Sequence, residues 1–206
     1  QQKLEPYRTY LHDGTYVGAD WSRYEIKPAS RYTTFLQAFT LFAENNGKIV
    51  VEVGTSHSYV HGGLPGCDSD DIRYWNPNKP EDWDWGAGFF TRMAAESLGH
   101  LNPTIYTVDL HAPAIRRCQI MTKPFQSIIQ YRVTSSENFL RSCDLVQKID
   151  LLYLDTGYVW PAEPTAELQL REAKIVVERD LIAPGGIILI DDVQNQTPYK
   201  FGDFTK

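Results

Sequence analysis

Short apolar runs alternate with segments of helical spacing along most of this 206-residue chain. The first helix is predicted from Ser30, because Phe35, Leu36, Phe39 and Phe42 share one helical face and Asn46-Gly47 provides a left-handed ending. Further helices are predicted around Phe89 to Leu98, after Pro113 and around Phe139. The predicted strands cover residues 48–53, 104–109, 127–133, 149–155 and 187–191. This alternation predicts a doubly wound α/β fold with a mostly parallel sheet, because parallel neighbours need helical crossovers on both faces.

The last predicted helix is long and amphipathic. Leu170, Ala173, Val177 and Leu181 recur at helical intervals and are expected to face the sheet. Residues 184–186, Pro-Gly-Gly, are expected to form the turn before the final strand. Residues 1–206 are long enough for about one domain with one sizeable core.

Two segments do not follow the alternation. Residues 1–29 are polar and Tyr-rich, and the sequence leaves open a cap, a substrate-binding arm or a lead-in. Residues 57–85 contain Trp75, Trp83 and Trp85, with six acidic residues against two basic ones. This insertion is expected to be either a lid with aromatic walls over a substrate or a packed structural excursion.

The charge and the cysteines exclude several classes of function. There are 20 Lys and Arg against 26 Asp and Glu, a net charge of -6, and no basic run, so nucleic acid is not an expected partner. No apolar stretch approaches the roughly 20 residues of a membrane span, and the N-terminus lacks the apolar core of a signal peptide. Three widely spaced cysteines favour a reducing, cytoplasmic location.

Ligands bind parallel sheets at the carboxyl ends of the strands, and here those ends carry polar residues. Asp109 ends the second strand, where an acid accepts hydrogen bonds from ribose hydroxyls. After the first strand, a single glycine, Gly54, precedes Thr55 and Ser56. A pyrophosphate cradle needs three glycines, so the sequence predicts a nucleoside ligand without phosphates.

Asp155, Asp191 and Asp192 follow two further strands and are expected to lie close together. Two charges about 4 Å apart repel by roughly 4 kcal/mol at an effective dielectric constant near 20, so such a cluster must hold a proton or a cation. Oxygen ligands favour Mg²⁺, with Mn²⁺ or Ca²⁺ as alternatives. The other interpretation is that one aspartate caps a turn and another pairs with a basic side chain.

The ordered set EVGTS (52–56), TIYTVD (104–109), IDLLYLD (149–155) and APGGIILIDD (183–192) resembles the class I S-adenosylmethionine-dependent methyltransferases, which have a Rossmann-like fold. The resemblance covers about residues 30–195 and is greatest to the metal-dependent O-methyltransferases of the catechol and macrocin types. It implies that Asp109 binds the ribose and Asp155, Asp191 and Asp192 bind the metal. It also implies two groups of cofactor contacts, at the methionine end (Glu52, Gly54, Thr55, Ser56) and at the adenine side (Ser136, Glu137).

The expected activity is therefore Mg²⁺-assisted methyl transfer from S-adenosylmethionine to a hydroxyl group of a small molecule. Asp155 is expected between the metal and the methyl group, and His57 or His61 as a base or substrate contact, although a loop histidine is more often solvated. The alternatives are a hydroxylase-like or hydrolase relative and a catalytically silent binding module. The family sheet has two further strands, which the residues after Asp192 are too few to form. A fragment, a shortened sheet or a second copy covering the open edge would each account for this.

Overall fold

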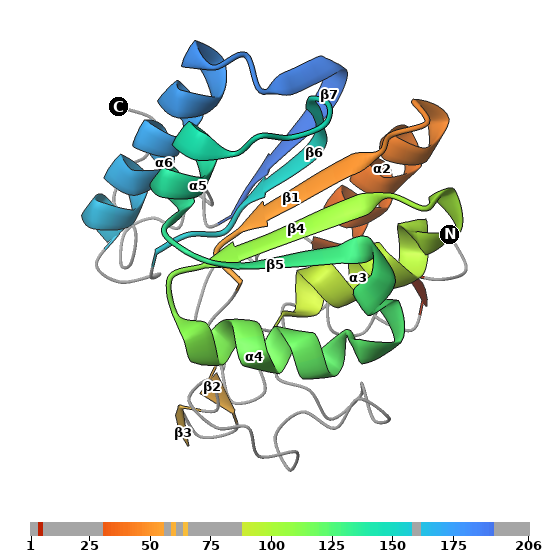
Figure 1. Cartoon of the computed structure of the whole chain (residues 1–206), viewed down its shortest axis with the longest axis horizontal. Helices are drawn as coiled ribbons and strands as arrows, with labels where there is room; N and C mark the ends of the chain where they lie inside the picture. The colour runs from red at the N-terminus through yellow and green to blue at the C-terminus, as the bar shows by residue number, and fades with distance from the viewer. Residues whose placement is uncertain are drawn as a thin grey trace, which may run out of the picture.

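A computed structural model describes residues 4–5, 31–55, 59–60, 64–65, 88–157 and 162–191. Within these residues the main sheet has five parallel strands in the order β5-β4-β1-β6-β7 (Figure 1). The strands are β1 (Ile49–Val53), β4 (Thr104–Asp109), β5 (Ile129–Val133), β6 (Ile149–Leu154) and β7 (Ile182–Ile190). A separate antiparallel pair, β2 (Tyr59–Val60) and β3 (Leu64–Pro65), lies within the predicted insertion.

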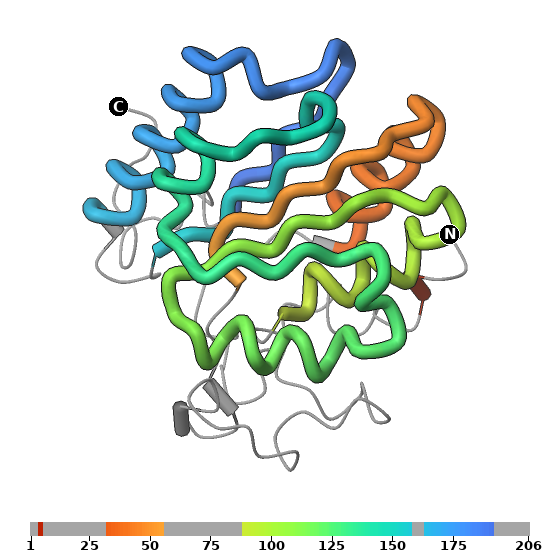
Figure 2. Tube along the Cα trace, viewed as in Figure 1, coloured from red at the N-terminus to blue at the C-terminus, as the bar shows by residue number. Residues whose placement is uncertain are grey.

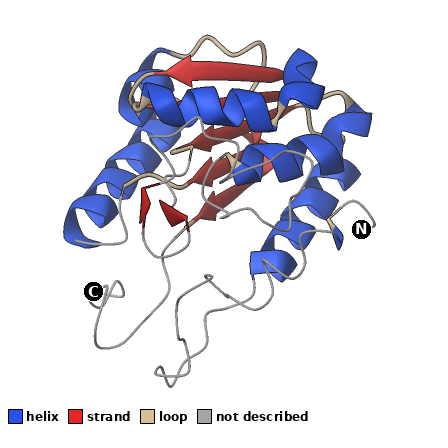
Figure 3. Ribbon diagram, turned by 90° about the horizontal axis from the view of Figure 1, so that it is seen from below, coloured by secondary structure: helices blue, strands red, loops and turns tan. Residues whose placement is uncertain are grey.

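Helices cover both faces of the sheet, as Figure 3 shows from below. One face is covered by α2, α3 and α4, and the other by α5 and α6 (Figure 1). The predicted doubly wound α/β fold is therefore confirmed. The helices are α2 (Arg31–Glu44), α3 (Phe89–Leu98), α4 (Ala112–Met121), α5 (Ser136–Ser142) and α6 (Ala162–Glu178), with short 3₁₀ segments at Gly99–Leu101 and Lys123–Ile128.

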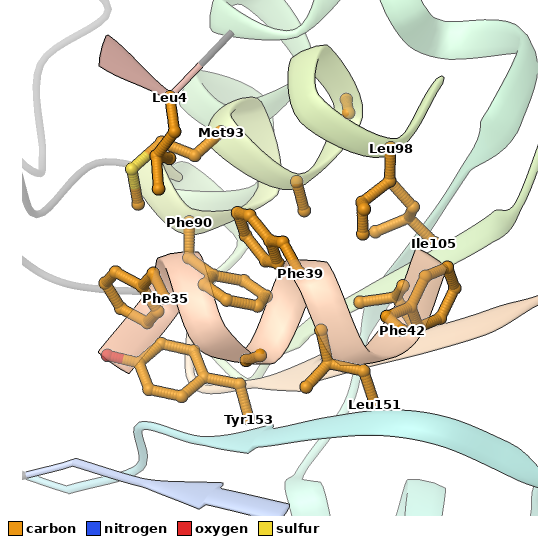
Figure 4. Close-up of a cluster of buried hydrophobic side chains, with 14 of the residues drawn as sticks. Leu4, Phe35, Phe39, Phe42, Phe90, Met93, Leu98, Ile105, Leu151 and Tyr153 are labelled. Carbon is orange, nitrogen blue, oxygen red and sulfur yellow. The ribbon is translucent and has the colours of Figure 1, made fainter. Parts of the chain in front are cut away.

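Aromatic side chains form the centre of the core under α2 (Figure 4). Phe35 of α2 lies 5.5 Å from Phe90 of α3 and 5.6 Å from Tyr153 of β6, measured between ring centroids. Phe39 and Phe42 are also buried, so the face predicted for the first helix is confirmed. Such rings contribute strongly to packing because each buries a large apolar area.

Two residues of the N-terminal arm contact the rest of the fold. Leu4 is buried in the aromatic cluster (Figure 4), and Tyr32 Oη donates a hydrogen bond to Glu5 Oε2 at 2.8 Å. These contacts favour the cap among the roles open for residues 1–29. The expected helix start at Ser30 lies outside the described residues.

The buried face predicted for the last helix is wrong at Leu170 and Val177, whereas Leu181, beyond the end of α6, is buried as expected. Leu170 is 56% exposed and Val177 is 77% exposed, whereas Glu172, Ile175 and Val176 are buried. The prediction assumed that polar side chains face water. Here Glu172 and Gln169 of α6 instead face the carboxyl ends of β6 and β7. They form hydrogen bonds with Thr156 and Asp191, which follow these two strands.

Two strand boundaries also differ from the prediction. Strand β7 starts at Ile182, so Pro184-Gly185-Gly186 lies within the strand at a shift in its register with β6 rather than in a preceding turn. Gly185 has a φ of 77°, which glycine adopts readily. Strand β5 starts at Ile129, because the preceding residues form a 3₁₀ segment with Pro124 near its start. No helix in the described ranges is long and apolar enough to cross a membrane.

Candidate functional site

The order of the strands changes direction beside β1. The chain passes from β1 through α3 to β4 and through α4 to β5, and then returns through α5 to β6 on the other side of β1 (Figure 2). In open parallel sheets, ligands bind at this switch point, outside the carboxyl ends of the two strands. Gly54 follows β1 there, and Asp155 and Thr156 follow β6. The backbone N–H of Asp155 donates to Val53 O at 2.9 Å, which holds the two strand ends together.

Gly54 makes the closest backbone approach at this point. Its φ is 87°, and a Cβ atom would lie 2.0 Å from Asp155 O and 2.8 Å from Thr156 N. Only glycine fits this conformation in this space. The close approach expected at Gly54 is thus present between two strand ends, while its contact with a ligand remains a prediction.

Asp109 lies at the carboxyl end of β4, next to β1. Its Oδ1 atom accepts a hydrogen bond from the backbone N–H of His111 at 2.6 Å, which fixes the direction of the carboxylate. Asp109 itself is buried, with 7% of its surface exposed. Leu110 is 74% exposed, and Val133 at the end of β5 is 56% exposed. An acceptor beside exposed apolar side chains suits a nucleoside, which has ribose hydroxyls and a flat base.

The sequence interpretation missed Leu110 and Val133. The sequence feature that could have identified them is an apolar residue at the end of a predicted strand, next to an acid that is predicted to bind a ligand. Single exposed apolar residues are common on protein surfaces, so this signal is weak without the fold.

Glu52 lies inside the protein, with no exposed surface. Its Oε2 atom accepts hydrogen bonds from Thr91 of α3 and, at 2.8 Å, from Thr107 of β4. Because Thr107 uses its single hydroxyl proton for Glu52, Thr55 is the donor in the hydrogen bond between Thr55 and Thr107. Burial is the main cause that raises the pKa of Glu52 from 4.5 to about 7; the hydrogen bonds from Thr91 and Thr107 lower it in part, and the charge of Asp109 adds a smaller increase. The expected contact of Glu52 and Thr55 with the cofactor remains a prediction.

Cys118 and Tyr131, beside this network, are both protonated at neutral pH. Burial, followed by the charge of Glu52, raises the pKa of the Cys118 thiol to about 12. Burial likewise raises the pKa of Tyr131, which shares a 2.6 Å hydrogen bond with Thr122, to about 12. Cys118 therefore stays protonated at neutral pH and is a packing residue rather than a nucleophile.

Ser136 and Glu137, the residues expected at the adenine side, begin α5. The Ser135 hydroxyl caps this helix by accepting from the backbone N–H of Asn138 at 3.2 Å. Ser136 is buried. Glu137 Oε1 accepts from Arg171 Nε at 3.3 Å, so its carboxylate pairs with α6. A cofactor contact of either residue remains a prediction.

Two of the three predicted metal ligands lie at adjacent strand ends. The backbone N–H of Asp191 donates to Leu154 O at 2.9 Å, which places Asp191 beside the end of β6 and Asp155. Tyr153 Oη donates to Asp191 Oδ2 at 2.9 Å, so one carboxylate oxygen already has a partner. The described ranges contain no group of three His, Cys, Asp or Glu side chains that could hold a metal ion. Asp192, Ser56, His57 and His61 lie outside those ranges.

Comparison with known proteins identifies the fold. No family model and no curated protein matches the chain. Among solved structures, the SAH-bound methyltransferase PaMTH1 of Podospora anserina superposes with a TM-score of 0.52 at 16% identity, over 93% of this chain and 62% of that one. This chain has the Rossmann-like methyltransferase fold. The O-methyltransferase TomG of Streptomyces achromogenes, solved with SAM, gives a TM-score of 0.48 at 10% identity, over 92% of this chain and 62% of that one. The chain thus spans less than two thirds of the length of each protein.

Proposed function

We propose that this chain binds S-adenosylmethionine at the switch point and transfers its methyl group to a hydroxyl group of a small molecule. The observation that carries the proposal is the glycine turn at Gly54, packed against Asp155 and Thr156, with Asp109 at the end of the neighbouring strand. This arrangement offers one close backbone approach and one ribose acceptor but no pyrophosphate cradle. The methyltransferase fold of the described residues supports the proposal.

Each part of the site has a place in this proposal. Asp109 accepts hydrogen bonds from the ribose hydroxyls, and Leu110 and Val133 provide apolar surface for the adenine. The methionine part of the cofactor lies over the turn at Gly54. The substrate lies on the far side of the methyl group, next to Asp155.

The reaction is a direct displacement. The hydroxyl oxygen of the substrate attacks the methyl carbon in line with the carbon–sulfur bond, which breaks and leaves S-adenosylhomocysteine. The hydroxyl proton goes to a base, for which Asp155, His57 and His61 are the candidates. Because the sulfonium is already activated, most of the rate comes from holding the two reactants in line.

A Mg²⁺ ion, with Mn²⁺ or Ca²⁺ as alternatives, would orient the hydroxyl group and lower its pKa. The described residues supply two of the three predicted ligands, and one oxygen of Asp191 is bonded to Tyr153. This part of the chain does not make a metal site by itself. No step of the reaction is therefore assigned to a metal, and dependence on Mg²⁺ remains a prediction.

The test is turnover with S-adenosylmethionine and a panel of small hydroxylated aromatics and sugars, followed by mass spectrometry of both products. The proposal predicts S-adenosylhomocysteine together with an O-methylated acceptor, and loss of both in Asp155→Ala. Asp144→Ala, which removes an exposed acid in a loop, is the control and keeps the wild-type rate. Transfer to a thiol or an amine alone would contradict the O-methyl assignment. Cofactor binding without turnover on any acceptor would instead indicate a silent binding module. Repeating the assay with a chelator tests the metal.

A further inference from the structure

A polar stripe runs along the buried side of α6. Thr165, Gln169 and Glu172 are spaced by four and three residues, which places them on one face of the helix. Gln169 Nε2 donates to Asp191 O at 3.4 Å, and Thr156 Oγ1 donates to Glu172 Oε2 at 2.8 Å. The second and third turns of α6 therefore contact the chain at the carboxyl ends of β7 and β6.

Thr165 fits against the chain just after β6. A Cβ atom at Gly157 would lie 2.4 Å from Thr165 Oγ1, and Gly157 has a φ of 92°. The turn after Asp155 is thus shaped to accept this helix. The stripe is a second layer directly behind the residues that form the proposed pocket.

Glu172 is the member of the stripe that needs an explanation. Its side chain has no exposed surface, and its Oε1 atom has no hydrogen-bond partner among the described residues. Burial raises its pKa, although the nearby hydroxyl groups of Ser136 and Thr156 lower it in part. Burying a carboxyl oxygen without a hydrogen-bond partner lowers stability. The presence of a carboxyl group here therefore calls for a reason other than stability.

The surroundings of Glu172 supply that reason. Thr156 and Ser136 are both buried, one after β6 and the other at the start of α5. The backbone N of Thr156 also lies 2.8 Å from where a Cβ atom of Gly54 would be. A shift of Thr156 would therefore be passed directly to the glycine turn. Glu172 thus lies between Thr156, which packs against the Gly54 turn, and Ser136, and the family resemblance assigns that turn to the methionine end of the cofactor and Ser136 to the adenine side.

We propose that Glu172 is a positioning residue for the methyl-donor pocket. Its carboxyl group holds Thr156 against the Gly54 turn and lies beside Ser136, so that the methionine side and the adenine side keep a fixed separation. The inference rests on the proposed function, since it assumes that S-adenosylmethionine binds at the switch point.

The test compares S-adenosylhomocysteine affinity and melting temperature in four single variants and one double variant of the full chain. Glu172→Leu is expected to remain folded and to bind about tenfold more weakly, as when one hydrogen-bonded contact is misplaced. Glu172→Gln is expected to stay within about threefold of the wild type, because its amide oxygen still accepts from Thr156. Glu167→Gln removes an exposed carboxyl group from the same helix and is the control.

Thr156→Val is the fourth variant and removes the same bond from the other side. If the two residues act through one bond, the Glu172→Leu/Thr156→Val double variant binds no more weakly than either single variant. If Glu172→Leu fails to fold, Thr156→Val alone shows whether loss of this hydrogen bond weakens S-adenosylhomocysteine binding. Wild-type affinity in both single variants would overturn the role of Glu172 and leave the proposed function intact. Absence of binding by the folded wild type would overturn the proposed function, and this inference with it.

Discussion

Glu52→Gln is the substitution that most directly probes the buried polar network behind the site. In the native protein the Oε2 atom of Glu52 accepts from Thr91 and Thr107. The amide oxygen of glutamine can accept both bonds, so the substitution keeps the network and removes only the titration. The two proteins should therefore differ in how their stability depends on pH.

The size of the difference follows from the pKa. Burial raises the pKa of Glu52 from 4.5 to about 7, so between these values the folded state holds a proton that the unfolded state has released. The stabilisation is complete below pH 4.5 and is lost as the pH rises through about 7. At about 1.4 kcal/mol for each pKa unit, the shift from 4.5 to about 7 corresponds to about 3.5 kcal/mol.

Urea unfolding at a series of pH values measures this. Between about pH 5 and pH 8 the wild type should lose roughly 2 to 3 kcal/mol of unfolding free energy relative to Glu52→Gln. Groups that titrate in both proteins cancel in the comparison. Glu44→Gln, at an exposed carboxyl group, is the control and should follow the wild type. A difference between wild type and Glu52→Gln that does not change with pH would refute the reasoning.

Two further predictions concern the backbone and the helix face. Gly54→Ala should lower the unfolding free energy by about 3 kcal/mol or more and abolish cofactor binding, because the added Cβ meets Asp155 O at 2.0 Å. Gly99→Ala, whose added Cβ would lie 3.7 Å from Ile128 Cδ1, should change the unfolding free energy by less than about 1 kcal/mol. Equal losses at both glycines would contradict the geometry. In urea unfolding, Leu170→Lys should change the unfolding free energy by less than about 0.5 kcal/mol, because Leu170 is exposed. Ile175→Ala should lower it by about 2 to 4 kcal/mol, because Ile175 is buried. A larger loss in Leu170→Lys than in Ile175→Ala would support the face predicted from the sequence.

The strands and the first helix could be predicted from the sequence because their signals are local. A parallel strand buried on both faces is apolar at nearly every position, as in Ile49–Val53. The phenylalanines of α2 repeat at helical spacing, and their face is buried as expected. The face of α6 could not be predicted in the same way. Its polar stripe faces the carboxyl ends of two strands, and hydrophobic periodicity carries no information about polar partners far away in the chain.

The same limit applies to the site. The sequence places Gly54, Asp109, Asp155 and Asp191 at one edge of the sheet, because strand ends can be read from the pattern. It does not show that Glu52 turns into the core, since the donors Thr91 and Thr107 are 39 and 55 residues away. The pairing of a glutamate of α5 with α6 is likewise a long-range contact, between residues 34 apart.

The central claim is that the switch point binds a nucleoside methyl donor, and calorimetric titration of S-adenosylhomocysteine into the full chain tests it most directly. The account predicts binding to one site, with the same affinity in Mg²⁺ and in a chelator. It also predicts at least about tenfold weaker binding in Asp109→Ala, which loses the ribose acceptor, and wild-type binding in Asp144→Ala. Absence of heat with folded wild-type protein, or undiminished affinity in Asp109→Ala, would contradict the account.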